Sequence, residues 1–110
     1  MLDRYFIRPT TVDRIRSSWI GDAIERYVSW LAEQKYAARS IFIRVPLLIR
    51  FGESAQRAGA RTLVDLPAHV EPFVHAWLEH CGKDYSELQR LAAVRGIRGP
   101  IQQMLHRIAP

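Results

Sequence analysis

The segment KYAARSIFIRVPLLIRFGESAQRAGA, residues 35–60, decides the fold of this chain. Its apolar residues recur at the three- and four-residue spacing that is typical of one buried helix face: Ile41, Val45, Leu48 and Ile49. The same segment is strongly basic, with a single acid, Glu53, against Lys35, Arg39, Arg44, Arg50 and Arg57. We therefore predict a helix with its apolar side in a small core and a basic edge outside that core.

Length and composition bound the class of protein. The 110 residues are 48% hydrophobic and 25% charged, which is ordinary for one globular domain with a modest core. No apolar run approaches the roughly 20 residues of a membrane span, and the N-terminal residues lack the apolar run of a signal peptide. The single cysteine, Cys81, excludes an internal disulfide. We therefore expect a cytoplasmic protein with no membrane partner.

Charge alternates along the chain. Residues 35–61 carry six bases and one acid, and residues 83–110 carry five bases and two acids. By contrast, residues 62–82 carry three acids and no base, and residues 21–34 carry three acids and one base. A basic face built from alternate segments is typical of a phosphate-binding surface. The alternative interpretation is that these charged residues form an ordinary solvated surface without a ligand. The segregation by segment favours nucleic acid as the partner.

Residues 1–20 are predicted to be an N-terminal leader, with a short helix over about residues 11–18 that packs Trp19 onto the domain proper, residues 21–110. Asp22 would cap the start of the first firm helix, and Glu25 would complete a capping box three residues later. That helix is predicted over residues 23–34, on the apolar stripe of Ile24, Tyr27, Val28 and Leu31.

Pro46 complicates the second helix, which is the basic segment itself. Ser40 is predicted to cap its start and Gly59 its end. Because proline removes one backbone hydrogen bond and clashes with the preceding turn, two alternatives stand. The helix kinks at Pro46, or it ends there and restarts with Pro46 in its first position. The side of this helix opposite to the apolar one carries Arg39, Arg50 and Arg57.

Two further helical segments are predicted in the C-terminal half. The first follows a loop over residues 61–67 and ends at Gly82; Pro67 fits its first turn and Pro72 would distort its early part. Its apolar stripe is Val70, Phe73, Val74, Trp77 and Leu78. The second begins at a capping box of Ser86 and Gln89 and is interrupted at Gly96–Pro100, so that it is either one broken helix or two helices. Since no segment alternates with period two, we predict an all-α, compact orthogonal bundle of four or five helices.

No arrangement of side chains indicates catalysis, a cofactor or a metal. His75 and His80 are five residues apart, which misses the i, i+4 spacing of a helical metal pair, and only one thiol is present. Cys81 follows His80 directly, so the two side chains point apart on a helix, and no third group orients them. The carboxylates are scattered, and Gly96–Gly99 lacks the Lys-Ser/Thr of a phosphate loop. We expect a binding module that is not an enzyme.

The candidate residues for contact with DNA are mainly the basic residues of the second and fourth helical segments. Arginine offers a planar fork that suits phosphate oxygens and guanine edges. The amides at the start of the second helix would add a phosphate site beside Ser40. The aromatic residues are assigned to core packing instead. The predicted DNA-binding residues are Lys35, Arg39, Ser40, Arg44, Arg50, Arg90, Arg95 and Arg98.

Residues 24–55 resemble the N-terminal, core-binding (SAM-like) domain of tyrosine recombinases, the phage-integrase family. The likeness rests on Trp30-Leu31 near the end of one helix, the turn Ala37-Ala38-Arg39-Ser40, and then Arg44, Leu48 and Phe51 in that order. Ala37 and Ser40 replace the usual Ser and Thr of the family, and Pro46 is a further departure. Residues 62–78 and 89–108 resemble the third helix of that domain and its Arg-rich fourth helix.

The resemblance implies a four-helix domain that clamps duplex DNA with its second and fourth helices near the grooves. In that family a separate catalytic domain cuts and rejoins DNA with a Tyr nucleophile and an Arg/His/Arg cluster, and this chain lacks such a series. The implied partners are double-stranded DNA, the catalytic domain of the same parent protein and other recombinase protomers on DNA. The implied setting is a bacterial or phage protein at the nucleoid.

The alternative is a helical protein–protein interaction module that does not bind DNA. Its docking surface would be an exposed apolar stripe near the C-terminus, made of Ile101, Met104, Leu105 and Ile108. Titration with duplex DNA separates the two hypotheses, because an interaction module should not bind DNA at moderate salt.

Overall fold

The computed structural model describes residues 9–108, and that part of the chain contains helices and no strand. The predicted all-α class is therefore confirmed. In chain order, the elements are α2 (Pro9–Ser17), α3 (Gly21–Glu33), α4 (Ala38–Arg57), the 3₁₀ helix η1 (Leu63–His69), α5 (Val70–Cys81) and α6 (Glu87–Ile108).

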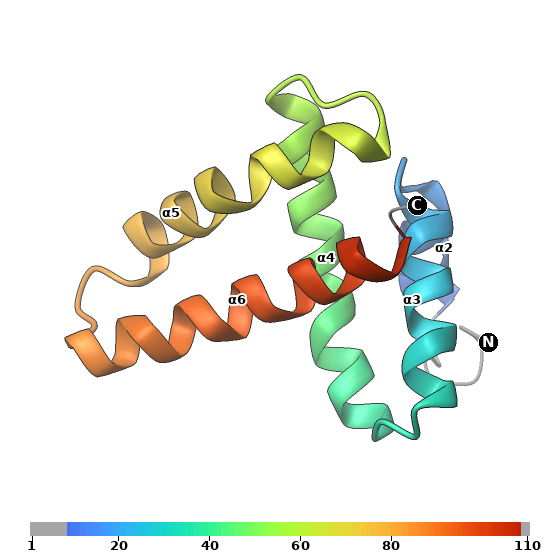
Figure 1. Cartoon of the computed structure of the whole chain (residues 1–110), viewed down its shortest axis with the longest axis horizontal. Helices are drawn as coiled ribbons and strands as arrows, with labels where there is room; N and C mark the ends of the chain where they lie inside the picture. The colour runs from blue at the N-terminus through green and yellow to red at the C-terminus, as the bar shows by residue number, and fades with distance from the viewer. Residues whose placement is uncertain (1–8, 109–110) are drawn as a thin grey trace.

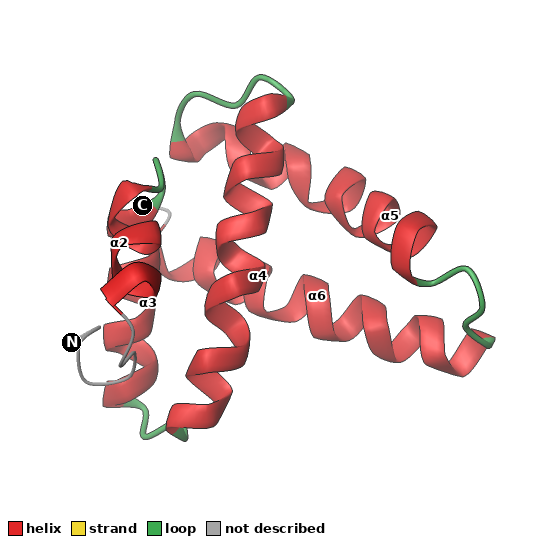
Figure 2. Ribbon diagram, turned by 180° about the vertical axis from the view of Figure 1, so that it is seen from behind, coloured by secondary structure: helices red, strands yellow, loops and turns green. Residues whose placement is uncertain are grey.

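The helices form a bundle around α4 and α6, which cross each other (Figure 1). α2 packs on α3, and α3 packs on both α4 and the C-terminal half of α6. α5 lies along α6, and the two extend together away from α2 and α3 (Figure 1). Seen from behind, α4 lies in front of α6, so that one long side of α4 is covered by no helix (Figure 2).

The core draws on every helix of the bundle. Its largest fully buried side chains are Ile15, Ile20, Ile24, Tyr27, Leu31, Ile41, Leu48, Phe51, Leu66, Ile101 and Met104. Ile15 belongs to α2, and the indole Nε1 of Trp19 donates a hydrogen bond to the carbonyl of Gly52 at 2.8 Å. The predicted short helix near residues 11–18 is confirmed, and the described part of the leader is an integral part of the core.

The start of α3 differs from the prediction. The helix begins at Gly21, and its N-cap is Ile20, which makes no side-chain capping bond; Asp22 lies inside the first turn. The predicted capping box of Asp22 and Glu25 is therefore wrong. The chain turns tightly out of α2, with the amide of Gly21 donating to the carbonyl of Ser18 at 2.9 Å, and this turn sets the start of the helix.

α4 is one unbroken helix through Pro46. An interior proline costs about 3 kcal/mol, whereas each buried aliphatic side chain contributes about 1.5–3 kcal/mol. Buried residues lie on both sides of Pro46, so a restart at Pro46 would misplace one half of them, and the alternative of a broken helix is wrong. The N-cap is Ala37 and not Ser40, which is the third residue of the helix.

Gly59 ends α4 as predicted. It adopts a φ of 106°, a left-handed conformation that glycine takes without strain. The amide of Ala60 donates to the carbonyl of Ala55 at 2.9 Å, and the amide of Gly59 donates to that of Gln56 at 3.1 Å. This pair of bonds is the Schellman motif, and it satisfies carbonyls that the helix end would otherwise leave without donors.

The segment that was predicted as a loop is the helix η1. The Asp65 carboxylate accepts hydrogen bonds from the amides of Arg61 at 3.0 Å and Thr62 at 3.1 Å, which lower the pKa of Asp65 below its ordinary value. Thr62 and Asp65 form a capping box that the T-x-x-D spacing could have revealed. Pro67 lies in η1 and not in the first turn of α5, whereas Pro72 is the third residue of α5, where a missing N–H costs no helical bond.

α6 runs without a break from Glu87 to Ile108, so the predicted interruption at Gly96–Pro100 is wrong. Proline disfavours the helical conformation of the preceding residue partly through that residue's Cβ, and Gly99 has none. Ile97 and Ile101 are both buried, and one continuous helix keeps them on the same face. The capping box of Ser86 and Gln89 is confirmed, with bonds of 2.9 and 3.2 Å.

Two glycines of α6 provide a matched test of this explanation. Apart from the adjoining residues and the backbone of the same helix turns, a Cβ at Gly96 or at Gly99 would meet no atom within 4 Å. Gly96→Ala should raise the free energy of unfolding by about 1 kcal/mol, because alanine is the better residue in a helix interior. Gly99→Ala should give no such gain, because its Cβ would meet the ring of Pro100. Urea denaturation of the two variants measures the difference; equal gains would contradict the role of Gly99.

Candidate nucleic-acid interface

The uncovered side of α4 carries a row of three arginines, Arg39, Arg50 and Arg57. All three are exposed, which confirms the common side predicted for them. They are 11 and 7 residues apart, so that they point within about 20° of one another and span about 27 Å along the helix. Ile43 and Pro46, also exposed, separate Arg39 from Arg50. We call the three arginines the α4 arginine row.

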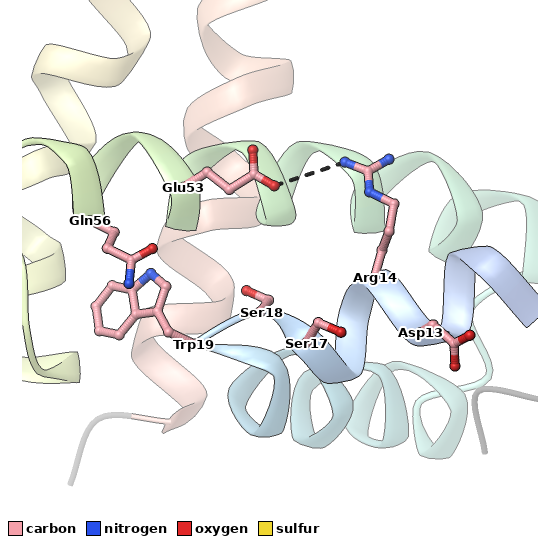
Figure 3. Close-up of a pocket in the computed structure, with 7 residues that line it drawn as sticks. All are labelled: Asp13, Arg14, Ser17, Ser18, Trp19, Glu53 and Gln56. Atoms are coloured by element: carbon pink, nitrogen blue, oxygen red, sulfur yellow. Dashed lines mark ion pairs between the residues drawn. The ribbon is translucent and has the colours of Figure 1, made fainter.

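The α4 arginine row is free to meet an external anion. Within the described part of the chain, none of its members forms an ion pair with an acid of the protein. The one acid of α4, Glu53, pairs instead with Arg14 of α2, at 4.0 Å between Oε1 and Nη2 (Figure 3). Both of these side chains are more than half exposed, so this pair contributes little to stability.

Arg44 is directed away from the α4 arginine row. It lies five residues after Arg39, about 140° around the helix, and is half-buried. Its Nη1 donates to the carbonyl of Ser40 at 3.2 Å, and its guanidinium carbon lies 5.2 Å from the ring centroid of Tyr36. Its Nε is buried without a hydrogen-bond partner in the described structure. Of the predicted contacts, Arg44 is therefore engaged by the protein itself.

Arg44 belongs to a cluster of polar and aromatic groups that joins α3, α4 and α6. The Tyr27 hydroxyl donates to Oε1 of Gln103, whose Nε2 donates to the Tyr36 hydroxyl at 3.4 Å. Burial raises the pKa of Tyr27, and the nearby positive charge of Arg44 opposes that effect. Arg107 lies 4.4 Å over the ring of Trp30, a cation–π contact that fastens the end of α6. This cluster stabilises the junction of the three helices.

The three predicted contacts on α6 do not share a face. Arg95 is exposed on the outer side of the helix, Arg90 lines the shallow groove between α5 and α6 together with Glu79, and Arg98 pairs with Glu71 of α5. Their spacings of five and three residues place them about 140° and 60° apart around the helix. The arginine side chains of α6 therefore point in different directions and do not form one basic surface.

Lys35 ends α3 in a left-handed conformation, with a φ of 63°. Its amide donates to the carbonyl of Ala32, and the amide of Tyr36 donates to that of Leu31, both at 3.0 Å. These two bonds form a Schellman motif that normally favours glycine at the position of Lys35. The tight turn keeps Lys35 exposed next to the start of α4.

Lys35→Gly should therefore stabilise the fold. A left-handed conformation costs a residue with a side chain roughly 1 kcal/mol, and glycine removes that strain. We expect the free energy of unfolding to rise by about 1 kcal/mol in urea denaturation. Gly59→Ala is the matched control at the end of α4, and it should lower stability by a similar amount. A neutral Lys35→Gly would contradict the strain at this turn.

The surface cavities are shallow and do not collect reactive groups. The groove between α2 and α4 has a volume of about 530 Å³ and is lined by Asp13, Arg14, Ser17, Ser18, Trp19, Glu53 and Gln56 (Figure 3). In the described residues, no three His, Cys, Asp or Glu side chains gather as metal ligands would. None of the described helices has the length and apolar character of a membrane span.

The apolar stripe predicted as a docking surface is buried. Ile101 and Met104 are fully buried, Leu105 is 8% exposed and Ile108 packs against the core. This part of α6 packs on α3 and α4, and Leu105 also lines a groove with Pro67 and Val70. The exposed apolar side chains of α6 are instead Leu88 and Leu91, at its opposite end.

No protein-family model, no curated protein and no solved structure matches the chain. The functional assignment therefore depends on the residues and on their arrangement in the fold.

Proposed function

We propose that this chain is a DNA-binding domain that contacts duplex DNA through the uncovered side of α4. The observation that carries the proposal is the α4 arginine row: Arg39, Arg50 and Arg57 are exposed, aligned and without acidic partners within the described residues. Lys35 adds a fourth exposed positive charge beside the start of α4. A linear row of cations suits the regular charge of a phosphate backbone.

Phosphate neutralisation would supply most of the affinity. Each arginine that contacts one phosphate releases counterions, so that the slope of log K against log salt changes by about 0.9 per contact on duplex DNA. The forked guanidinium bonds phosphate oxygens in pairs, which orients the protein without reading sequence. The chain would thus bind duplex DNA with steep salt dependence and little base preference.

The resemblance to the core-binding domain of tyrosine recombinases supports the same class of function. In this proposal the chain does no chemistry itself, and a catalytic domain of a parent recombinase would act on the DNA that it holds. Its partners would be DNA, that domain and further recombinase protomers. A bacterial or phage cytoplasm is the setting that this proposal implies.

Fluorescence anisotropy with a labelled duplex, measured across a salt series, tests the proposal. Arg39→Ala should weaken binding about tenfold at 0.1 M salt and lower the salt slope by about 0.9, with unchanged thermal stability. Arg44→Ala should lower the thermal midpoint and change the salt slope less, because its guanidinium is engaged with Ser40 and Tyr36. Absence of binding at low salt, or equal salt slopes for wild type and Arg39→Ala, would refute the proposal.

A further inference from the structure

The first two turns of α6 present two large apolar side chains to solvent. Leu88 is 80% exposed and Leu91 is 60% exposed, three residues apart on the outer side of the helix. This end of α6 extends beyond α4, with only α5 beside it (Figure 1). Contiguous apolar surface marks contact sites, and these two leucines are the exposed large apolar side chains of α6.

Charged residues flank Leu91 symmetrically. Glu87 precedes it by four residues and Arg95 follows it by four, so that the three form one row along the helix. Within the described residues, neither Glu87 nor Arg95 has an ion-pair partner. Along the helix the row consists of an acidic residue, a leucine and a basic residue. Two antiparallel copies of the row would therefore place the acidic residue of each opposite the basic residue of the other.

We propose that this face is a contact between two copies of the chain, with the two α6 helices antiparallel about Leu91. In this pairing the two Leu91 side chains meet at a two-fold axis, where an isologous dimer places each residue against its own equivalent. Glu87 then lies opposite Arg95 of the second copy, about 6 Å along the helix to either side of the centre. Leu88 closes the apolar part of the contact.

The self-complementary charge selects a second copy over an unrelated partner. An antiparallel pair joins opposite charges at both ends of the contact, whereas a parallel pair would align Glu87 with Glu87 and Arg95 with Arg95. A second copy of the chain carries the matching charges at the required spacing on either side of Leu91, so this complementarity requires no other protein. Two helical turns from each copy bury less than the roughly 1,200 Å² of a stable complex, so association is weak.

Sedimentation velocity of the full 110-residue chain without DNA tests the contact. The wild-type chain should shift from monomer towards dimer as its concentration rises from about 20 μM to 1 mM, as expected for a small interface. Glu87→Arg and Arg95→Glu should each sediment as monomers, because each places like charges opposite one another twice. An equimolar mixture of the two variants should dimerise again, because the mixed pair restores both opposite-charge contacts.

Disulfide trapping locates the two-fold axis. In a Cys81→Ser background, Leu91→Cys should form a disulfide-linked dimer under mild oxidation at least tenfold faster than Gln34→Cys, which is exposed outside this face. Thermal melts of all variants verify that each is folded. A chain that stays monomeric to 1 mM, a mixture that does not dimerise, or equal trapping rates would overturn the proposal. DNA is absent from every sample, so the outcome is independent of DNA binding.

Discussion

Replacing Arg39, Arg50 and Arg57 together by alanine is expected to weaken duplex DNA binding about 500-fold at 0.1 M salt. The slope of log K against log salt is about 0.9 for each phosphate contact. Between 1 M and 0.1 M salt, three contacts therefore raise the binding constant by about 2.7 powers of ten. The slope of log K against log salt should fall by about the same 2.7. The three side chains are exposed and unpaired in the described structure, so the thermal midpoint should change little. Anisotropy titrations at four or more salt concentrations measure both quantities.

The triple variant Lys83→Ala, Arg90→Ala and Arg98→Ala removes the same charge from the hairpin of α5 and α6. Arg90 and Lys83 line one groove there, and Arg98 is held by Glu71. This control should lose far less affinity if the α4 arginine row is the contact. Equal losses in the two triple variants would mean that net charge alone drives binding, and the assignment to α4 would fail.

Gly21→Ala is expected to lower the free energy of unfolding by about 2 kcal/mol. A Cβ at Gly21 would lie 2.3 Å from the carbonyl oxygen of Ile15, and both atoms belong to backbones that cannot rotate away. Separating α2 from α3 costs about 3 kcal/mol as an overpacking effect, while the better helix propensity of alanine returns about 1 kcal/mol. The thermal midpoint should fall by about 10 °C.

Gly52→Ala is the control for this prediction. Its Cβ would lie 2.7 Å from Cδ1 and 2.8 Å from Cγ1 of Ile20, which belong to a side chain and not to a backbone, so its loss should be smaller. Urea denaturation and thermal melts of both variants measure the order. If Gly21→Ala is as stable as the wild-type chain, α2 does not lie against α3 at this distance.

Much of the fold could be predicted from local pattern. The apolar stripe of α4 is buried as expected, and the caps at Gly59 and at Ser86–Gln89 lie where their residue types indicate. Such features depend on residues within one or two turns of each other, and this is the range in which periodicity and capping chemistry operate. The alignment of Arg39, Arg50 and Arg57 follows from the same arithmetic of a single helix.

The errors arose where packing between helices outweighed local preference. Pro46 and the segment Gly96–Pro100 carry unfavourable helix residues, yet both helices continue because buried residues on either side must share one face. The error at Ser40 has a local cause instead: the Schellman turn at Lys35 is followed by Ala37 in the extended conformation that starts α4.

The sequence by itself determined the helical class, the core stripe of α4 and the basic character of its outer side. Only the tertiary structure decided which basic side chains remain available to bind an external anion. Arg44 is held at Tyr36 and Ser40, and Arg98 is held by Glu71. It also buried Ile101 and left Leu88 and Leu91 exposed at the far end of the same helix. The reason is physical, since periodicity shows which residues share a face, whereas the element that covers that face comes from elsewhere in the chain.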